Sequence, residues 1–131
     1  MKLVRGYVFS RPFMEERVPQ HVQNLVIRDY CKKHGLQYLL SATEYAMPEC
    51  YLMLNQVLEE LPQFQGIAAY SMFQLPENNT QREAVLQTVL KFGKVIYFAV
   101  EGLSLEQEKD LERIETIWQV KKTLPKCPVK F

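Results

Sequence analysis

The sequence predicts a doubly wound α/β fold, with helices on both faces of a mainly parallel, four-stranded sheet. The first observation behind this prediction is that short apolar segments alternate with longer segments of helical periodicity along the chain. The second is composition, since 47% of the 131 residues are hydrophobic and 24% are charged, as in ordinary globular domains. A chain of this length buries one core, so we expect a single domain over residues 1–131.

The first strand is expected over residues 3–9, an apolar segment that ends at Ser10 and Arg11. Val18-Pro19 should open the first helix, because proline suits the first helical position. His34-Gly35 should close it, with glycine in the left-handed conformation. The apolar stripe expected on this helix consists of Val22, Leu25, Val26, Tyr30 and Cys31.

The second strand is expected over residues 38–42, before Met47-Pro48 interrupts the chain. Leucines at helical spacing follow from residue 52 to residue 61, and Pro62 ends that helix. Residues 66–71 are short and apolar and predict the third strand.

A turn at residues 76–80 leads into the third helix. Thr80-Gln-Arg-Glu83 has the pattern of a capping box, in which two side chains satisfy free backbone N–H groups at a helix start. The helix should end at Phe92-Gly93, and residues 94–100 predict the fourth strand.

Residues 104–107 repeat the capping-box pattern, so a long last helix is expected over about residues 104–124, before a proline-containing tail at 125–131. We expect the strand order 2-1-3-4, right-handed crossovers and a three-layer sandwich. Ligands should then bind at the carboxyl ends of the strands, in the crevice between the first and third strands.

Composition narrows the possible partners and cofactors. The net charge is only +1, which disfavours a domain held on DNA mainly by phosphate contacts. No apolar stretch approaches the roughly 20 residues of a membrane span and no signal peptide is visible, so we expect a cytoplasmic protein. The three cysteines are too widely spaced for a metal motif. No GxGxxG, P-loop, GxSxG or HExxH motif occurs, so we expect no cofactor and no metal.

Polar residues gather where the predicted strands end and where the first helix begins. A helix start offers free N–H groups, arginine offers a planar fork for carboxylate or phosphate, and carboxylates suit sugar hydroxyls. The candidates for nucleophilic attack or proton transfer are Ser10, His21 and Glu44. The candidate ligand-binding residues are Arg11, Arg17, Gln20, Asn24, Tyr45, Ser71 and Glu101.

Structural interpretations of these residues stay open. Ser10 could end the strand–helix loop, and both Arg11 and Arg17 could be solvated cations. His21, without a second metal-type partner, could be an exposed helix residue, and Glu44 could be a solvated carboxylate.

The last helix has two faces. Residues 106–115 form a charged, solvated face. Leu111, Ile114 and Trp118 form an apolar stripe, which packs on the core of the domain or forms a homodimer seam.

Residues 6–10, Gly-Tyr-Val-Phe-Ser, resemble the opening strand of the serine recombinase (resolvase) catalytic domain, and residues 23–35 resemble its first helix. Met47-Pro48-Glu49 is similar to that family's entry to the second helix. The resemblance extends to about residue 100 and implies a doubly wound fold of the resolvase or flavodoxin type. It also implies that Ser10 lies where the family keeps its nucleophile.

Two departures argue against recombinase activity. The first strand lacks the family's arginine, and residues 72–76 lack the acid and the arginines that the family has after its third strand. Phosphodiester attack needs cationic stabilisation of the developing charge, and these cations are missing. No DNA-binding helix-turn-helix follows.

A second resemblance covers nearly the whole chain. It rests on residues 5–12, 19–25 and 40–48 and on Glu101-Gly-Leu103, which are similar to signature segments of a family of small proteins from sporadic bacterial carbohydrate biosynthesis clusters. It implies a role in making a surface glycan or its precursor, with no assigned reaction to carry over.

Three functions follow from these observations. The leading hypothesis is a protein that binds or transforms a sugar acid, sugar phosphate or nucleotide sugar at the carboxyl edge of the sheet. The alternative is a non-catalytic, dimeric, resolvase-like module that assembles with partner carbohydrate enzymes through its last helix. A degenerate DNA-binding domain has the least support.

Overall fold

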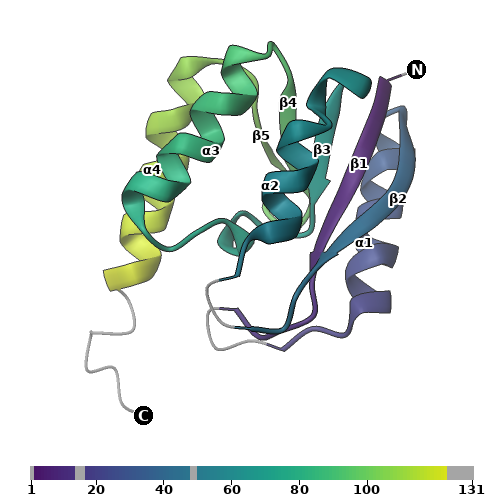
Figure 1. Ribbon diagram of the computed structural model, residues 1–131, viewed down its shortest axis with the longest axis horizontal. Helices are drawn as coiled ribbons and strands as arrows, with labels where there is room; N and C mark the ends of the chain where they lie inside the picture. The colour runs from purple at the N-terminus through teal and green to yellow at the C-terminus, as the bar shows by residue number, and fades with distance from the viewer. Residues whose placement is uncertain (1, 14–16, 48–49, 124–131) are drawn as a thin grey trace.

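The computed structural model describes residues 2–13, 17–47 and 50–123, and its centre is a five-stranded sheet (Figure 1). The strand order is β2-β1-β3-β4-β5. The first four strands pair in parallel, as predicted, and β5 pairs antiparallel to β4. The strands span Lys2–Phe9 (β1), Leu36–Glu44 (β2), Gly66–Ala69 (β3), Val95–Phe98 (β4) and Leu103–Leu105 (β5).

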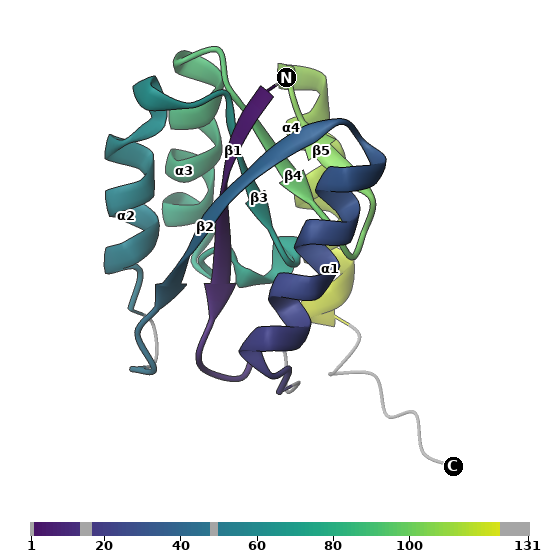
Figure 2. The same cartoon turned by 90° about the vertical axis from the view of Figure 1, so that its right-hand side faces the viewer.

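Helices cover both faces of the sheet, which confirms the doubly wound architecture (Figure 2). Side chains of α1 pack with one buried cluster, whereas α2, α3 and α4 pack with a larger cluster on the other face. The helices span Gln20–Lys33 (α1), Leu52–Glu59 (α2), Asn79–Lys91 (α3) and Glu108–Thr123 (α4). Two short 3-10 helices span Leu61–Gln63 (η1) and Met72–Gln74 (η2).

The prediction of a four-stranded sheet and of a helix from residue 104 is wrong at one point, because residues 103–105 form β5. Gly102 turns the chain with φ +65°, and Leu105 is buried opposite Ile96 of β4. The Asp110 carboxylate accepts hydrogen bonds from the backbone N–H groups of Glu106 and Gln107, so the helix begins only at Glu108. The predicted tail at 125–131 lies outside the described residues.

The predicted capping box at residues 80–83 is also wrong. The N-cap of α3 is Asn78, whose side-chain oxygen accepts a hydrogen bond from the N–H of Gln81, and the helix begins at Asn79. The predicted end is confirmed, since Gly93 follows the helix with φ +68°.

The buried face of α1 differs from the predicted stripe. Pro19 precedes the helix at the N-cap, and the buried positions are Gln23, Ile27 and Cys31, each four residues after the last. Leu25, predicted to face the core, is 60% exposed. A polar residue at position 23 therefore occupies a core position that the apolar pattern did not reveal.

A bulge twists the edge strand β2. Arg5 pairs with Leu39 but Gly6 pairs with Ser41, so Leu40 is the extra residue and its side chain is 77% exposed. Gly6 is required here because a β-carbon would collide with the Ser41 hydroxyl. The bulge interrupts an edge that would otherwise offer a long run of unpaired backbone groups.

The apolar stripe of α4 packs inside the domain. Ile114 and Trp118 are 1% and 0% exposed, and the Trp118 indole N–H donates to the Met72 carbonyl at 3.2 Å. The prediction that these two side chains form a dimer seam is therefore wrong, because they are already buried in their own chain. Within the described residues, no helix is long and apolar enough to cross a membrane.

Candidate functional site

Ser10 and Arg11 follow the carboxyl end of β1 and meet the chain that leaves β2. The Ser10 hydroxyl donates to the Glu44 carbonyl at 2.6 Å. One terminal nitrogen of Arg11, Nη1, donates to the carbonyls of Tyr45 and Cys50 at 2.8 and 3.0 Å. Both residues thus hold the segment between β2 and α2, as expected where parallel strands end at one edge.

The Arg11 guanidinium lies over aromatic rings. Its central carbon is 4.2 Å from the centre of the Phe9 ring and 5.1 Å from that of Tyr51. Within the described part of the chain, no carboxylate lies within ion-pair distance of Arg11. The Arg11 side chain is half-buried, and neutral carbonyls accept hydrogen bonds from only one of its nitrogens. Its guanidinium can therefore bind an external anion.

Glu44 is buried, with only 1% of its surface exposed. Its carboxylate accepts hydrogen bonds from the Tyr7 hydroxyl at 2.8 Å and from the N–H groups of Met53 and Leu54 at 3.0 Å each. Those two N–H groups lie in the first turn of α2, where a helix has free donors and the positive end of its dipole. Glu44 therefore anchors the start of α2 to the end of the sheet.

The Tyr7 hydroxyl is held in its protonated form. Burial raises the pKa of Tyr7 above its ordinary value, and the neighbouring Glu44 carboxylate raises it further. Burial also raises the pKa of Tyr51, although the positive charge of Arg11 opposes that shift. Both phenols are thus hydrogen-bond donors at neutral pH.

At the crevice predicted between β1 and β3 lie two buried glutamines that were not among the predicted site residues. Gln23 and Gln74 are 0% and 1% exposed, and their side chains join in a hydrogen bond of 2.8 Å. Gln23 also accepts from the N–H of Phe9 and donates to its carbonyl, as a neighbouring strand would. The buried pair thus occupies the topological switch point.

Two hollows flank this crevice. The first, here called the Ser10 hollow, has a volume of about 280 Å³ and is lined in part by Ser10, Arg11, Arg17 and Gln20. The second, here called the Tyr51 hollow, has a volume of about 260 Å³. Its lining residues are Phe9, Arg11, Pro12, Phe13, Ala46, Tyr51, Phe73, Glu77, Asn78 and Gln81. Phe9 and Arg11 line both hollows, so Arg11 stands at their junction.

Several predicted site residues lie away from the Ser10 hollow. Asn24 accepts hydrogen bonds from the hydroxyls of Tyr38 and Ser41, so it joins α1 to β2. The Ser71 hydroxyl donates to the Glu101 carboxylate at 2.7 Å, and Glu101 also accepts from the N–H of Met72. This second pair holds η2 against the end of β4.

The remaining two candidates are exposed. His21 lies in the first turn of α1, one residue after Gln20, and Tyr45 is 51% exposed beside the Arg11 contact. The structure thus brings together Ser10, Arg11, Arg17 and Gln20 around one hollow and places His21 next to them in sequence. In the described ranges, no group of three or more His, Cys, Asp or Glu is arranged to hold a metal ion.

Comparison with known proteins reveals a likeness of fold. The sequence matches no family model and no curated protein. The chain is similar in structure to a resolvase family site-specific recombinase from Streptococcus pneumoniae, with a TM-score of 0.67, 8% identity and coverage of 94% of this chain and 91% of that one. It is also similar to the N-terminal catalytic domain of TP901-1 integrase, with a TM-score of 0.59, 10% identity and coverage of 93% and 96%.

The comparison confirms the doubly wound, resolvase-like fold that the first strand and first helix suggested. At these identities the likeness concerns the fold alone, since one fold hosts many unrelated functions. Nothing in the comparisons supports membership of the carbohydrate cluster family, which stays a prediction from the sequence.

Proposed function

We propose that this chain binds an anionic carbohydrate ligand, such as a sugar acid, a sugar phosphate or a nucleotide sugar, in the Ser10 hollow. The observation that carries the proposal is Arg11, a half-buried guanidinium without a carboxylate partner among the described residues. A half-buried guanidinium of this kind gains charge-assisted hydrogen bonds from an anionic ligand. The carbohydrate class rests on the sequence resemblance to the carbohydrate cluster proteins.

The surroundings of Ser10 favour binding over phosphodiester chemistry. The hydroxyl already donates to the Glu44 carbonyl, so its remaining capacity is to accept a hydrogen bond from a ligand hydroxyl. The segment after β3 supplies Met72, Phe73 and Gln74 in place of cations. Arg11 and Arg17 hold the anion, the exposed N–H groups at the start of α1 contribute to it, and His21 serves any proton transfer.

The test uses glucose 1-phosphate and glucuronic acid, with neutral glucose as the uncharged control. A ligand at 100 times its dissociation constant stabilises the folded state by about 2.7 kcal/mol, which should raise the Tm by roughly 5–10 °C. Neutral glucose should leave the Tm unchanged.

A pair of arginine variants locates the site. Arg17→Gln should reduce the shift caused by glucose 1-phosphate, whereas Arg28→Gln should not, because Arg28 lies over the Tyr38 ring on another part of α1. Equal shifts in the two variants, or no shift with either anion, would contradict the proposal.

A second candidate function is a non-catalytic, resolvase-like module that assembles with carbohydrate enzymes. The fold supports it, and so does the exposed Leu40 on the edge strand β2. Light scattering across a concentration series tests it: a dimer that Leu40→Ser dissociates would favour this function, and a monomer at every concentration would exclude self-assembly.

A further inference from the structure

The Tyr51 hollow continues the Ser10 hollow on the other side of Arg11. Phe9 and Arg11 line both spaces, so a ligand whose anionic group binds Arg11 can extend from one hollow into the other. The volume of about 260 Å³ lies just below the ~300–1,000 Å³ typical of complete ligand sites, which suits one ring system rather than a whole ligand.

Four aromatic residues contribute to the wall of the Tyr51 hollow. Phe9, Phe13, Tyr51 and Phe73 all line it, and Tyr51 and Phe73 are only half-buried. The rings of Phe9 and Phe13 pack edge to face, with centres 5.7 Å apart, and Tyr51 lies at 6.3 Å from Phe9. Phe9 and Phe13 are buried, so the half-buried rings of Tyr51 and Phe73 are the ones that can stack on a flat aromatic group.

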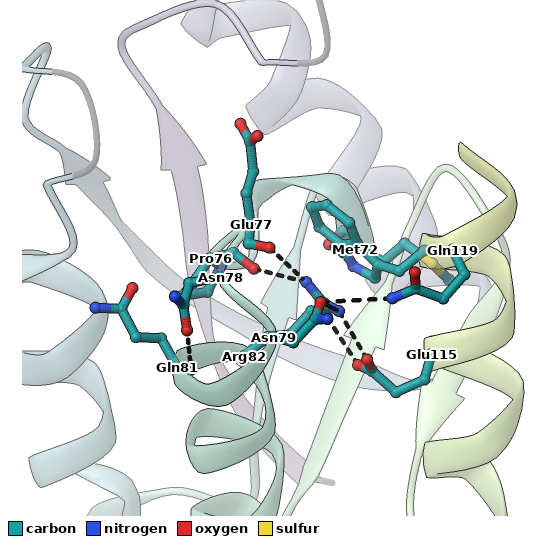
Figure 3. Close-up of polar contacts among 10 residues, drawn as sticks. Met72, Pro76, Glu77, Asn78, Asn79, Gln81, Arg82, Glu115 and Gln119 are labelled. Atoms are coloured by element: carbon teal, nitrogen blue, oxygen red, sulfur yellow. Dashed lines mark hydrogen bonds and ion pairs between the residues drawn. The ribbon is translucent and has the colours of Figure 1, made fainter. Parts of the chain in front are cut away.

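Two amide side chains, Asn78 and Gln81, also line the Tyr51 hollow. The Asn78 oxygen caps α3, which leaves its NH₂ group as a donor, and Gln81 is exposed. In Figure 3 the Gln81 side chain extends from α3 toward α2, away from the polar cluster around Arg82. Paired donors and acceptors next to aromatic rings match the hydrogen-bonding edge of a nucleobase.

The wall that carries these amides is held in place from behind. Arg82 is fully buried and donates to the carbonyls of Pro76 and Glu77 and to the side chain of Asn79 (Figure 3). Its Nε and Nη2 donate to the two carboxylate oxygens of Glu115, each at 2.7 Å. The segment that contributes Glu77 and Asn78 to the hollow is therefore preorganised, which lowers the entropic cost of binding.

We propose that the Tyr51 hollow binds the nucleoside of a nucleoside diphosphate-linked ligand, with Arg11 holding the diphosphate between the two hollows. This inference rests on the proposed function and narrows its ligand to the nucleotide-linked class.

A larger, mainly apolar groove of about 460 Å³ between α2 and α3 adjoins the hollow through Tyr51 and Gln81. Arg11 does not line that groove, so it offers no comparable partner for the diphosphate.

The experiment compares uridine 5′-diphosphate with inorganic pyrophosphate by calorimetric titration, because the two probes share the diphosphate and differ in the nucleoside. We expect uridine 5′-diphosphate to bind at least about tenfold tighter, from the stacking of the base on aromatic rings. Gln81→Ala should lower the affinity for uridine 5′-diphosphate about three- to tenfold and leave the affinity for pyrophosphate unchanged.

Two further variants keep the test decisive. Gln87→Ala is the matched control, since Gln87 is also an exposed residue of α3 but lines a different depression of the surface. Tyr51→Leu removes one stacking ring and should weaken the binding of uridine 5′-diphosphate more than that of pyrophosphate, which it affects only through the contact between Tyr51 and Arg11. Thermal melts without ligand check that each variant is folded.

The outcomes separate this inference from the proposed function. Equal affinity for the two probes, or equal effects of Gln81→Ala and Gln87→Ala, would overturn the nucleoside subsite while leaving the anion site in place. Failure of both probes to bind would overturn the anion site itself, and the subsite with it.

Discussion

Arg82 and Arg11 have similar aromatic and backbone surroundings but different electrostatic partners. Arg82 and Arg11 each stack on an aromatic ring, at 4.3 Å from the Trp118 ring and 4.2 Å from the Phe9 ring, and each donates to two backbone carbonyls. Arg82 also forms a bidentate ion pair with Glu115, whereas no described carboxylate pairs with Arg11.

The difference shows that an arginine stabilises the fold where a carboxylate pairs with it, as at Arg82, and is available to bind a ligand where none does, as at Arg11. Burying a cation is costly unless a carboxylate and hydrogen bonds compensate it, and Arg82 has both. Arg11 stays half-exposed at the junction of two hollows, so its charge is compensated by solvent until an anion arrives. The predictions below test this contrast.

The largest effect is expected from Arg82→Met. The apolar side chain fills a similar volume but removes the donors to Pro76, Glu77, Asn79 and Glu115, which should lower the free energy of unfolding by about 3 kcal/mol. Urea unfolding at pH 7 measures this loss. A loss below about 1 kcal/mol would mean that the ion pair adds little to the stability of the α3–α4 packing.

Glu44→Gln should have the next largest effect. Oε1 accepts from two donors and Oε2 from three, including the Cys50 thiol, and an amide NH₂ in place of either oxygen would face donors instead of accepting from them. We expect a loss of about 2–3 kcal/mol in unfolding free energy. Glu59→Gln, at an exposed position of α2, is the control and should stay within about 0.5 kcal/mol of the original protein.

Arg11→Met should change stability little and binding strongly. We expect a loss of at most about 1 kcal/mol in unfolding free energy, because the surrounding carbonyls can turn to water. The affinity for glucose 1-phosphate should fall at least about tenfold, as measured by titration calorimetry. A loss of unfolding free energy as large as that of Arg82→Met would mean that Arg11 also stabilises the fold, and would contradict the proposed difference between the two arginines.

The smallest effect concerns Cys31, which faces the core from α1 on the side away from both arginines. Burial raises the pKa of its thiol to about 11, above the ~8.5 of an unfolded cysteine. The folded chain therefore binds more protons in this interval, and stability should fall as the pH rises from about 8.5 to 11. Replacement by alanine should reduce this slope in unfolding measurements at pH 8 and pH 10. An unchanged slope would mean that other groups cause it.

The site was less predictable than the fold. Ser10 and Arg11 were visible in the sequence because polar residues after a strand mark the binding edge of a parallel sheet. The contact between Gln23 and Gln74 was not visible, because it joins positions 51 residues apart. Gln23 belongs to segments that resemble known families, but nothing in them indicates a partner at position 74. Gln81 was hidden in the same way, since only the packing of α3 beside the loop after β2 turns an exposed glutamine into a wall of the Tyr51 hollow.

The sequence by itself determined the alternation of strands and helices, the parallel order of the first four strands and the edge at which they end. It could do so because backbone hydrogen bonding imposes local periods that apolar residues must follow. Tertiary structure alone decided which polar groups are buried and which face a ligand. The sequence left Glu44 open between a functional and a solvated carboxylate, and only the start of α2 against the end of β2 buries it. Likewise, a carboxylate on α4 pairs with Arg82, while the described surroundings of Arg11 offer carbonyls and rings.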